Sequence, residues 1–196
     1  MESIAKGNHT YTAGICIIYN SSNGSTYADE LIINNCVNNG EIEGDTVAGI
    51  IGNSSGNLKL SDCENNGAIN GRYSAGGIAQ CIENKNSNEA EVSNCINNGN
   101  VFGGEEAAGI IDYAEGITVT NCINNGNISS NGYVGGIFSY TSSVKGTGLV
   151  NNGKISGLED IGGISAYDEG NSIFSKLYNT GVIDEENIGA QVSKSC

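Results

Sequence analysis

Asparagine-glycine corners recur along this 196-residue chain at a nearly constant spacing. Five of the six corners read Asn-Asn-Gly, and the last reads Asn-Thr-Gly. Their first asparagines lie 27 (65 − 38), 32, 27, 27 and 28 residues apart, at Asn38, Asn65, Asn97, Asn124, Asn151 and Asn179. A fixed period in this range is typical of repeat architectures, in which each unit stacks on its neighbours. The period therefore constrains the fold more than any other feature of the chain.

Each repeat contains short bursts in which apolar and polar residues alternate. Leu58 and Leu60 form one such pair, and Ile117 and Val119 form another. A period of two indicates β-strands, and no window shows the i, i+3, i+4 stripe of a helix. Gly, Asn, Ser and Asp bound each burst, as expected at corners. The sequence therefore predicts an all-β fold: a parallel β-solenoid of about six to seven coils, with about 27 residues and three short strands per coil.

The uniform repeats predict one elongated domain. Ordering a coil costs on the order of 30–50 kcal/mol of backbone entropy, more than its few buried aliphatic side chains return, so a coil cannot fold alone. Stacked coils share one core and stabilise each other. We expect a lead-in over residues 1–10 and a single solenoid domain over residues 11–196. Because neither end shows an amphipathic capping helix, we interpret the domain as an excerpt of a longer array.

Two columns of equivalent side chains are expected inside the stack. A thiol column continued by leucine favours buried, reduced cysteines over disulfides. Zinc is disfavoured because the chain has no Cys-x-x-Cys pair and one histidine, His9. The corner asparagines form the second column, in which stacked amides bond each other, and the corner glycine is expected to supply a positive φ. The thiol column lies four positions before each corner glycine: Cys36, Cys63, Cys95, Cys122, Leu149 and Leu177.

A third column consists of Tyr113, Tyr140 and Tyr167, each four residues after a recurring glycine. Their parity with the core isoleucines predicts rings that point outward or sit at a corner. One interpretation is a packing stripe that stiffens the corner. The other is an aromatic track for a glycan or a partner surface, because aromatic residues with one wet end are favoured at interfaces.

An acidic column lies four residues before the same glycines. It includes Asp45, Glu105 and Glu159, with Asp160 beside the last of them. A solvated acidic edge is the simpler interpretation. Calcium is the alternative, with Glu105, Glu159 and Asp160 as candidate ligands, because the ion prefers several hard oxygen ligands. The calcium-binding pattern Gly-Gly-x-Gly-x-Asp does not occur in the chain. We therefore expect no metal and no cofactor.

Two insertions lengthen the first and third repeats, over residues 19–30 and 83–91. They are expected to emerge from the same corner of their coils. Per-repeat insertions on one face often form a binding face, although surface loops are also tolerated without function. Tyr19, Tyr27 and Lys85 are the candidate ligand-binding residues of these loops.

The amino-acid composition disfavours some classes of binding partner. The net charge is −14 with 8 lysines and arginines, which disfavours nucleic acid and anionic membranes as partners. The chain contains no apolar run of transmembrane length, so no membrane insertion is expected. Its first residues lack the apolar segment of a signal peptide. An intracellular chain and a piece of a longer exported protein are both consistent with that start.

Four recurring segments resemble the GLUG repeat, which is built around a Gly-Gly-Leu-Val-Gly core followed by an Asn/Gly-rich turn. The chain uses Ile in place of Leu and often lacks the final glycine. The resemblance covers about residues 11–192 and implies a cell-surface or secreted stalk or adhesive segment of a bacterial protein. Such segments occur in adhesin-like proteins and in non-catalytic regions of IgA-specific metallopeptidases. The segments are Val47–Gly52, Ala75–Ala79, Val134–Phe138 and Ile161–Ser165.

We therefore expect a non-enzymatic, structural and adhesive module, located extracellularly or at the cell surface. Its partner would be a glycan or a host surface protein, and flanking repeats of the same chain could stack on it. The first alternative is an enzyme of the parallel β-helix type acting on polysaccharide, which would need paired carboxylates in a cleft. The second is a passive spacer of a larger surface peptidase.

Overall fold

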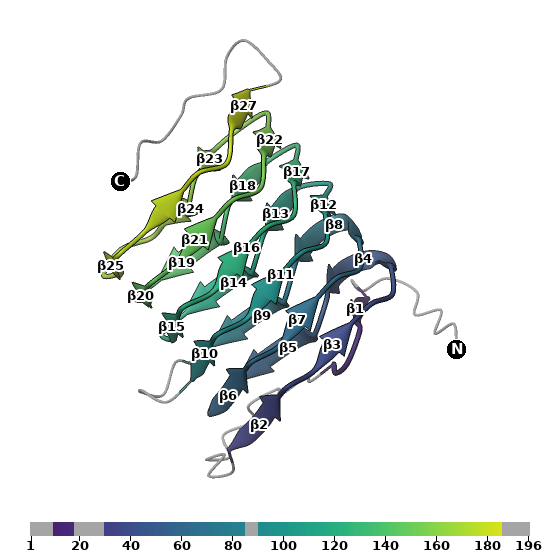
Figure 1. The fold of residues 1–196 in the computed structure, drawn as a ribbon, viewed down its shortest axis with the longest axis vertical. Helices are drawn as coiled ribbons and strands as arrows, with labels where there is room; N and C mark the ends of the chain where they lie inside the picture. Colours follow the sequence, from purple (N-terminus) through teal and green to yellow (C-terminus); the bar gives the residue numbers. More distant parts are fainter. Residues whose placement is uncertain (1–9, 18–29, 85–89, 186–196) are drawn as a thin grey trace.

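The computed structural model describes residues 10–17, 30–84 and 90–185. It confirms the predicted fold class: the described residues form parallel strands and no helix. The chain winds as a β-solenoid whose coils stack along the long axis of the molecule, from the N-terminal coil to the C-terminal coil (Figure 1). Six inward asparagines, one per coil, keep the predicted repeat of about 27 residues.

Equivalent strands of successive coils pair in parallel into four sheets, numbered in the order in which the chain enters them from β2 onward. Sheet 1 holds β2 (Leu31–Asn34), β6 (Leu58–Ser61), β10 (Glu91–Ser93), β15 (Thr118–Thr120), β20 (Lys145–Thr147) and β25 (Ile173–Ser175). Sheet 2 holds β3 (Val37–Asn38), β7 (Glu64–Asn65), β11 (Ile96–Asn97), β16 (Ile123–Asn124), β21 (Val150–Asn151) and β26 (Tyr178–Asn179).

Sheet 3 has two arms. The first arm holds β4 (Ile42–Ala48), β8 (Ile69–Gly76), β12 (Val101–Gly103), β17 (Ile128–Ser130), β22 (Ile155–Gly157) and β27 (Ile183–Glu185). The second arm holds β13 (Glu106–Ala108), β18 (Tyr133–Gly135) and β23 (Ile161–Gly162), while β1 (Tyr11–Ala13) pairs with the end of β4. Sheet 4 holds β5 (Ile51–Ser55), β9 (Ala79–Glu83), β14 (Ile111–Glu115), β19 (Phe138–Ser142) and β24 (Ser165–Asp168).

The division of each coil differs from the expectation of three strands. A typical coil contains five short segments, for example β15, β16, β17, β18 and β19. Sequence alternation did not separate the two arms of sheet 3, because in two coils β4 and β8 run through both arms as one strand. The later coils interrupt that strand, so β12 and β13 pair with successive parts of β8.

Two apolar clusters fill the stack. The larger one contains side chains from sheets 1 and 4 and the thiol column, including Leu60, Val92, Ile110 and Phe138. The smaller one lies between the two arms of sheet 3 and includes Ile69, Val101, Ala107, Ile128 and Val134. Each coil from β2 to β24 contributes to both clusters, so the core is continuous along these coils, as expected for a solenoid.

The thiol column is part of the larger cluster. Cys63, Cys95 and Cys122 are buried and free, and Cys36 is free and half-buried. The hydrogen bond with Cys122 and burial raise the pKa of the Cys95 thiol to about 12. Leu149 occupies the equivalent buried position in the next coil. The column therefore packs in the core, and the structure leaves these cysteines unbridged.

The inner asparagines form the predicted amide ladder. Each inner Nδ2 donates to the Oδ1 of the asparagine in the following coil at 2.7–2.8 Å, from Asn38 through Asn179. The same nitrogen also donates to the carbonyl of its own corner glycine. A second, exposed ladder runs along the next residue, and its donors point the opposite way, from Asn152 to Asn125 and from Asn125 to Asn98.

The expected role of the corner glycines is wrong. They do not have positive φ; that conformation falls instead on the residue before the thiol column, at Asn35, Asp62, Asn94 and Asn121. Asparagine and aspartate tolerate this conformation better than most residues. The corner glycine is required for close approach: a Cβ on Gly126 would lie 1.8 Å from the carbonyl oxygen of Gly99 in the preceding coil.

Candidate functional site

The predicted tyrosine column exists on sheet 4. Tyr113, Tyr140 and Tyr167 are paired in register on β14, β19 and β24. The rings of Tyr113 and Tyr140 stack with centroids 4.7 Å apart and planes inclined by 9°. Tyr140 and Tyr167 are 5.3 Å apart and inclined by 31°. Because stacked rings cover each other's faces, this column offers mainly ring edges and hydroxyl groups to a ligand.

Carboxylates hold the hydroxyl groups of this column. Tyr140 donates to Glu169 at 2.7 Å, and Tyr113 donates to Glu115 at 3.1 Å. The hydrogen bond to Glu169, with some burial, raises the pKa of the Tyr140 phenol to about 12. Burial and Glu115 also raise the pKa of Tyr113. These contacts fix the rings of Tyr113 and Tyr140, as expected for a packing stripe. Tyr167, which is 43% exposed, is the most accessible of the three rings.

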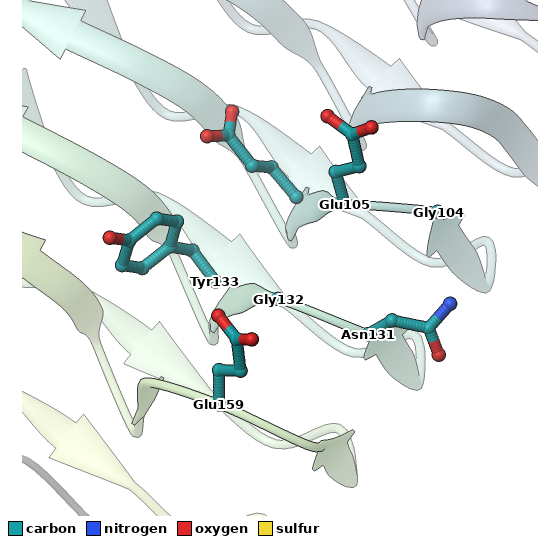
Figure 2. Close-up of a pocket in the computed structure, with 7 residues that line it drawn as sticks. Gly104, Glu105, Asn131, Gly132, Tyr133 and Glu159 are labelled. Carbon is teal, nitrogen blue, oxygen red and sulfur yellow. The ribbon is translucent and has the colours of Figure 1, made fainter.

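The acidic column produces a hollow beside this stripe. Glu105, Gly132 and Glu159 occupy equivalent positions in three successive coils, where Gly132 follows the backbone of Glu105. A glycine between two glutamates leaves an empty position in the column. The resulting hollow has a volume of about 340 Å³. Figure 2 shows Gly132 between Glu105 and Glu159, with the Tyr133 ring on one side and Asn131 on the other.

The lining of the hollow combines oxygen acceptors with one aromatic ring. Glu105, Glu106, Asn131, Tyr133 and Glu159 contribute side chains to it. Burial, followed by the neighbouring charge of Glu105, raises the pKa of the Glu106 carboxyl. The Tyr133 ring lies 5.9 Å from the ring of Tyr167, inclined by 55°. The hollow and the exposed end of the tyrosine column therefore form one continuous surface.

A polar cluster lies across the bend at Gly109, which joins β13 to β14. Asp112 is fully buried there. Gln80 Nε2 donates to Asp112 Oδ2 at 3.2 Å, and the Ser139 hydroxyl donates to the carboxylate and to the backbone oxygen of Asp112. The hydroxyl of Ser74 also bonds Asp112. Burial, followed by the charge of Glu106, raises the pKa of the Asp112 carboxyl to about 7.

The structure brings together only part of the predicted site. Glu105 and Glu159 line the hollow, whereas Asp160 precedes β23 and is not part of its lining. In residues 10–17, 30–84 and 90–185, no three His, Cys, Asp or Glu side chains are arranged to hold a metal ion. The loop candidates Tyr19, Tyr27 and Lys85 lie outside the described residues.

The sequence interpretation missed Gln80, Asp112 and Ser139. Each lies three residues after a recurring glycine and one before the tyrosine column, within a strand that otherwise reads as apolar. A position-by-position alignment of the repeats would have shown polar residues at a place that Gly52 and Ala166 fill in other coils. That departure from the repeat is the signal that was available.

Comparisons with protein-family models, with curated proteins and with solved structures give no match to this chain. Among the residues that the structure describes, none form a helix long and apolar enough to cross a membrane. The functional argument therefore depends on the geometry of the site.

Proposed function

We propose that this chain is a non-catalytic β-solenoid module of a surface or secreted bacterial protein, and that it binds a glycan in the hollow beside the tyrosine column. The observation that supports the proposal is the lining itself: three glutamates, one asparagine and the Tyr133 ring around a volume of about 340 Å³. A volume of this size is at the small end of the range for small-molecule sites and fits one or two sugar units.

The chemistry of the lining favours neutral or amino-bearing sugars. Carboxylate and amide oxygens accept hydrogen bonds from sugar hydroxyl groups, and an aromatic ring offers an apolar surface with a polar end. Glu105, Glu106 and Glu159 would repel a sulfated or sialylated glycan, because like charges at short range disfavour binding. The net charge of −14 acts in the same direction.

A glycan array tests the proposal. We expect neutral or amino-bearing glycans to bind the purified chain, and sulfated or sialylated glycans to fail. Tyr133→Ala should weaken binding by about tenfold or more, as expected for an aromatic anchor. Tyr178→Ala is the matched control, because Tyr178 is an exposed tyrosine on sheet 2, away from the hollow. An array without binding, or binding that Tyr133→Ala leaves unchanged, would contradict the proposal.

A polysaccharide-acting enzyme is the second candidate, and one observation favours it. Glu106 lines the hollow with a raised pKa, which is the property of a general acid. The other carboxyl group with a raised pKa, Asp112, is fully buried and cannot reach a substrate directly. Release of new reducing ends from a bound polysaccharide, lost in Glu106→Gln, would establish the enzymatic alternative.

A further inference from the structure

One column of sheet 4 has small residues in its outer coils and polar residues in its three central coils. Its residues are buried and lie at equivalent positions, because the residues on both sides of each are paired in register. They read Gly52, Gln80, Asp112, Ser139 and Ala166 from the second coil onward. Small residues at both ends show that the position can be filled without polar groups. The polar residues of the three central coils therefore require a chemical reason.

The central member of this column is a carboxylate without a compensating positive charge. Asp112 is 0% exposed, and the groups that act on it are Glu106, Ser139, Gln80 and Ser74. Of these, only Glu106 carries a charge, and that charge is also negative. Placing a carboxylate in the interior is expensive unless it is paired or coordinates a metal. The hydroxyl and amide donors around Asp112 lower this cost but do not neutralise two carboxyl groups.

Gln80 provides an independent observation at the same place. Its side chain is buried, with a relative exposure of 8%, and Nε2 donates to Asp112. This bond fixes the amide beside the carboxylate. The other end of the amide, Oε1, is buried and has no hydrogen-bond partner. A buried acceptor without a partner normally indicates a ligand or an ordered water that completes it.

We propose that Asp112, Glu106 and Gln80 Oε1 form a site for one hard divalent cation of the calcium class, with the Ser74 hydroxyl as a further oxygen ligand. Two carboxylates, an amide oxygen and a hydroxyl are the donors that calcium prefers, and the ion accepts irregular arrangements that magnesium does not. Each carboxylate oxygen of Asp112 has a second lone pair, so the bonds from Gln80 and Ser139 leave room for coordination.

The position of Glu106 explains how a cation would reach this site. Glu106 is half-buried and lines the hollow, and Ser74, its partner on the neighbouring strand, hydrogen-bonds both Glu106 and the buried Asp112. Bound cation would join sheet 3 to sheet 4 across the bend at Gly109. This role is distinguishable from glycan binding, because Glu106 is the one residue shared with the hollow, whereas Asp112 and Gln80 are not part of its lining.

Thermal unfolding with calcium chloride tests this site. After chelator treatment, the full chain is melted in a mildly alkaline buffer with calcium, magnesium or sodium chloride at equal ionic strength. At calcium concentrations about a hundredfold above the dissociation constant, the melting temperature should rise by about 5–10 °C. Magnesium should give a smaller shift, and sodium chloride none beyond screening.

Variants separate the site from general charge screening on an acidic chain. Asp112→Asn and Glu106→Gln should both abolish the calcium shift, whereas Glu159→Gln removes one charge from the rim of the hollow and should retain it. Isothermal titration with calcium chloride should give one site per chain in the native protein and none in Asp112→Asn. Circular dichroism confirms that each variant is folded.

An absent calcium shift in the native chain would overturn the proposal, and so would an equal shift in Asp112→Asn. In the first case, a water molecule would donate to Gln80 Oε1 and a proton would neutralise Asp112. In the second case, calcium would act only by screening the negative surface charge. The glycan proposal is tested with Tyr133→Ala, which keeps every proposed cation ligand. Failure of either proposal therefore does not imply failure of the other.

Discussion

The corner of the inner asparagines and the corner between sheets 3 and 4 are made by the same coils, yet they differ in how strictly they repeat. The first keeps Asn and Gly in all six coils and the same amide bonds along the stack. The second changes from Gly52 to Asp112 to Ala166 in one column and from Glu105 to Gly132 to Glu159 in another. Strict repetition marks what the fold requires, and departures mark where the chain can carry a site.

The largest expected effect comes from adding one methyl group at the repeating corner. In Gly126→Ala the new Cβ would meet the Gly99 carbonyl oxygen at 1.8 Å, so two coils must move apart. We expect a loss of about 4 kcal/mol or more in the free energy of unfolding. Gly52→Ala is the control in the variable column, because its nearest contact would be 3.6 Å away. Urea denaturation measures both, and equal losses would contradict the distinction between the corners.

The next effect separates the two amide ladders. Asn124 is fully buried; it donates to Gly126 and Asn151 and accepts from Asn97. Asn124→Ala removes these bonds and leaves buried partners unpaired, which should lower the free energy of unfolding by about 3–4 kcal/mol. Asn125→Ala, in the exposed ladder, should cost less than about 1 kcal/mol, since water replaces the lost bonds. Similar losses for the two variants would show that burial does not control ladder strength.

A smaller effect, of opposite sign, is expected at the variable corner. The folded-state pKa of Asp112, about 7, lies above the ordinary carboxyl value, so the folded chain retains a proton that the unfolded chain releases. In the presence of a chelator, the free energy of unfolding should therefore fall as the pH rises from about 4 to about 7 and then level off. Asp112→Asn should reduce this slope, leaving the part due to Glu106, whose pKa is also raised, and should stabilise the chain above pH 7 by roughly 1–3 kcal/mol.

Denaturant titrations at several pH values measure this slope. Glu91→Gln is the matched control, because Glu91 is exposed on sheet 1 and far from the cluster in the coil. A chain whose stability rises between pH 4 and pH 7 in the chelator, or an Asp112→Asn variant less stable than the native chain above pH 7, would contradict the assignment of an uncompensated carboxylate.

The smallest effect concerns the tyrosine column. Tyr140→Phe removes the hydrogen bond to Glu169 and keeps the ring stack, so it should cost less than about 1 kcal/mol. The pKa of Tyr140, about 12, exceeds the ordinary value of about 10. The contribution of this bond is therefore complete below pH 10 and is lost as the pH rises through 12. Ultraviolet titration should show tyrosinate forming late in the native chain and earlier on average when Glu169→Gln removes the acceptor.

The sequence predicted the parts of the molecule that depend on period. The spacing of the asparagines determined the coil length, and the positions of Cys63, Cys95 and Cys122 relative to them placed a buried thiol column correctly. Tyr113 and Tyr140 were also placed in one column. Parity predicted rings that point outward or sit at a corner, but not how the rings stack, because stacking depends on the side-chain torsion angles and on Glu115 and Glu169 rather than on spacing.

The candidate site was predicted only in part because it depends on the path of the chain around the bend at Gly109. Glu105 and Glu159 were found from their column, but the hollow between them results from an absent side chain at Gly132. Asp112 and Glu106 are six residues apart, and the electrostatic interaction between them depends on how the chain turns from β13 into β14. The alternation of apolar and polar residues contains no information on the angle of the bend at Gly109.

The opposite directions of the two asparagine ladders have an electrostatic consequence for arrays of this kind. Each amide carries a dipole, and a single ladder would add these dipoles along the axis, as the peptide units of a helix do. The inner ladder donates toward the C-terminal coils and the exposed ladder toward the N-terminal coils, from Asn38 to Asn65 in one and from Asn125 to Asn98 in the other. The two contributions largely cancel, so a stack built on this corner can gain coils without accumulating partial charge from its amides at either end.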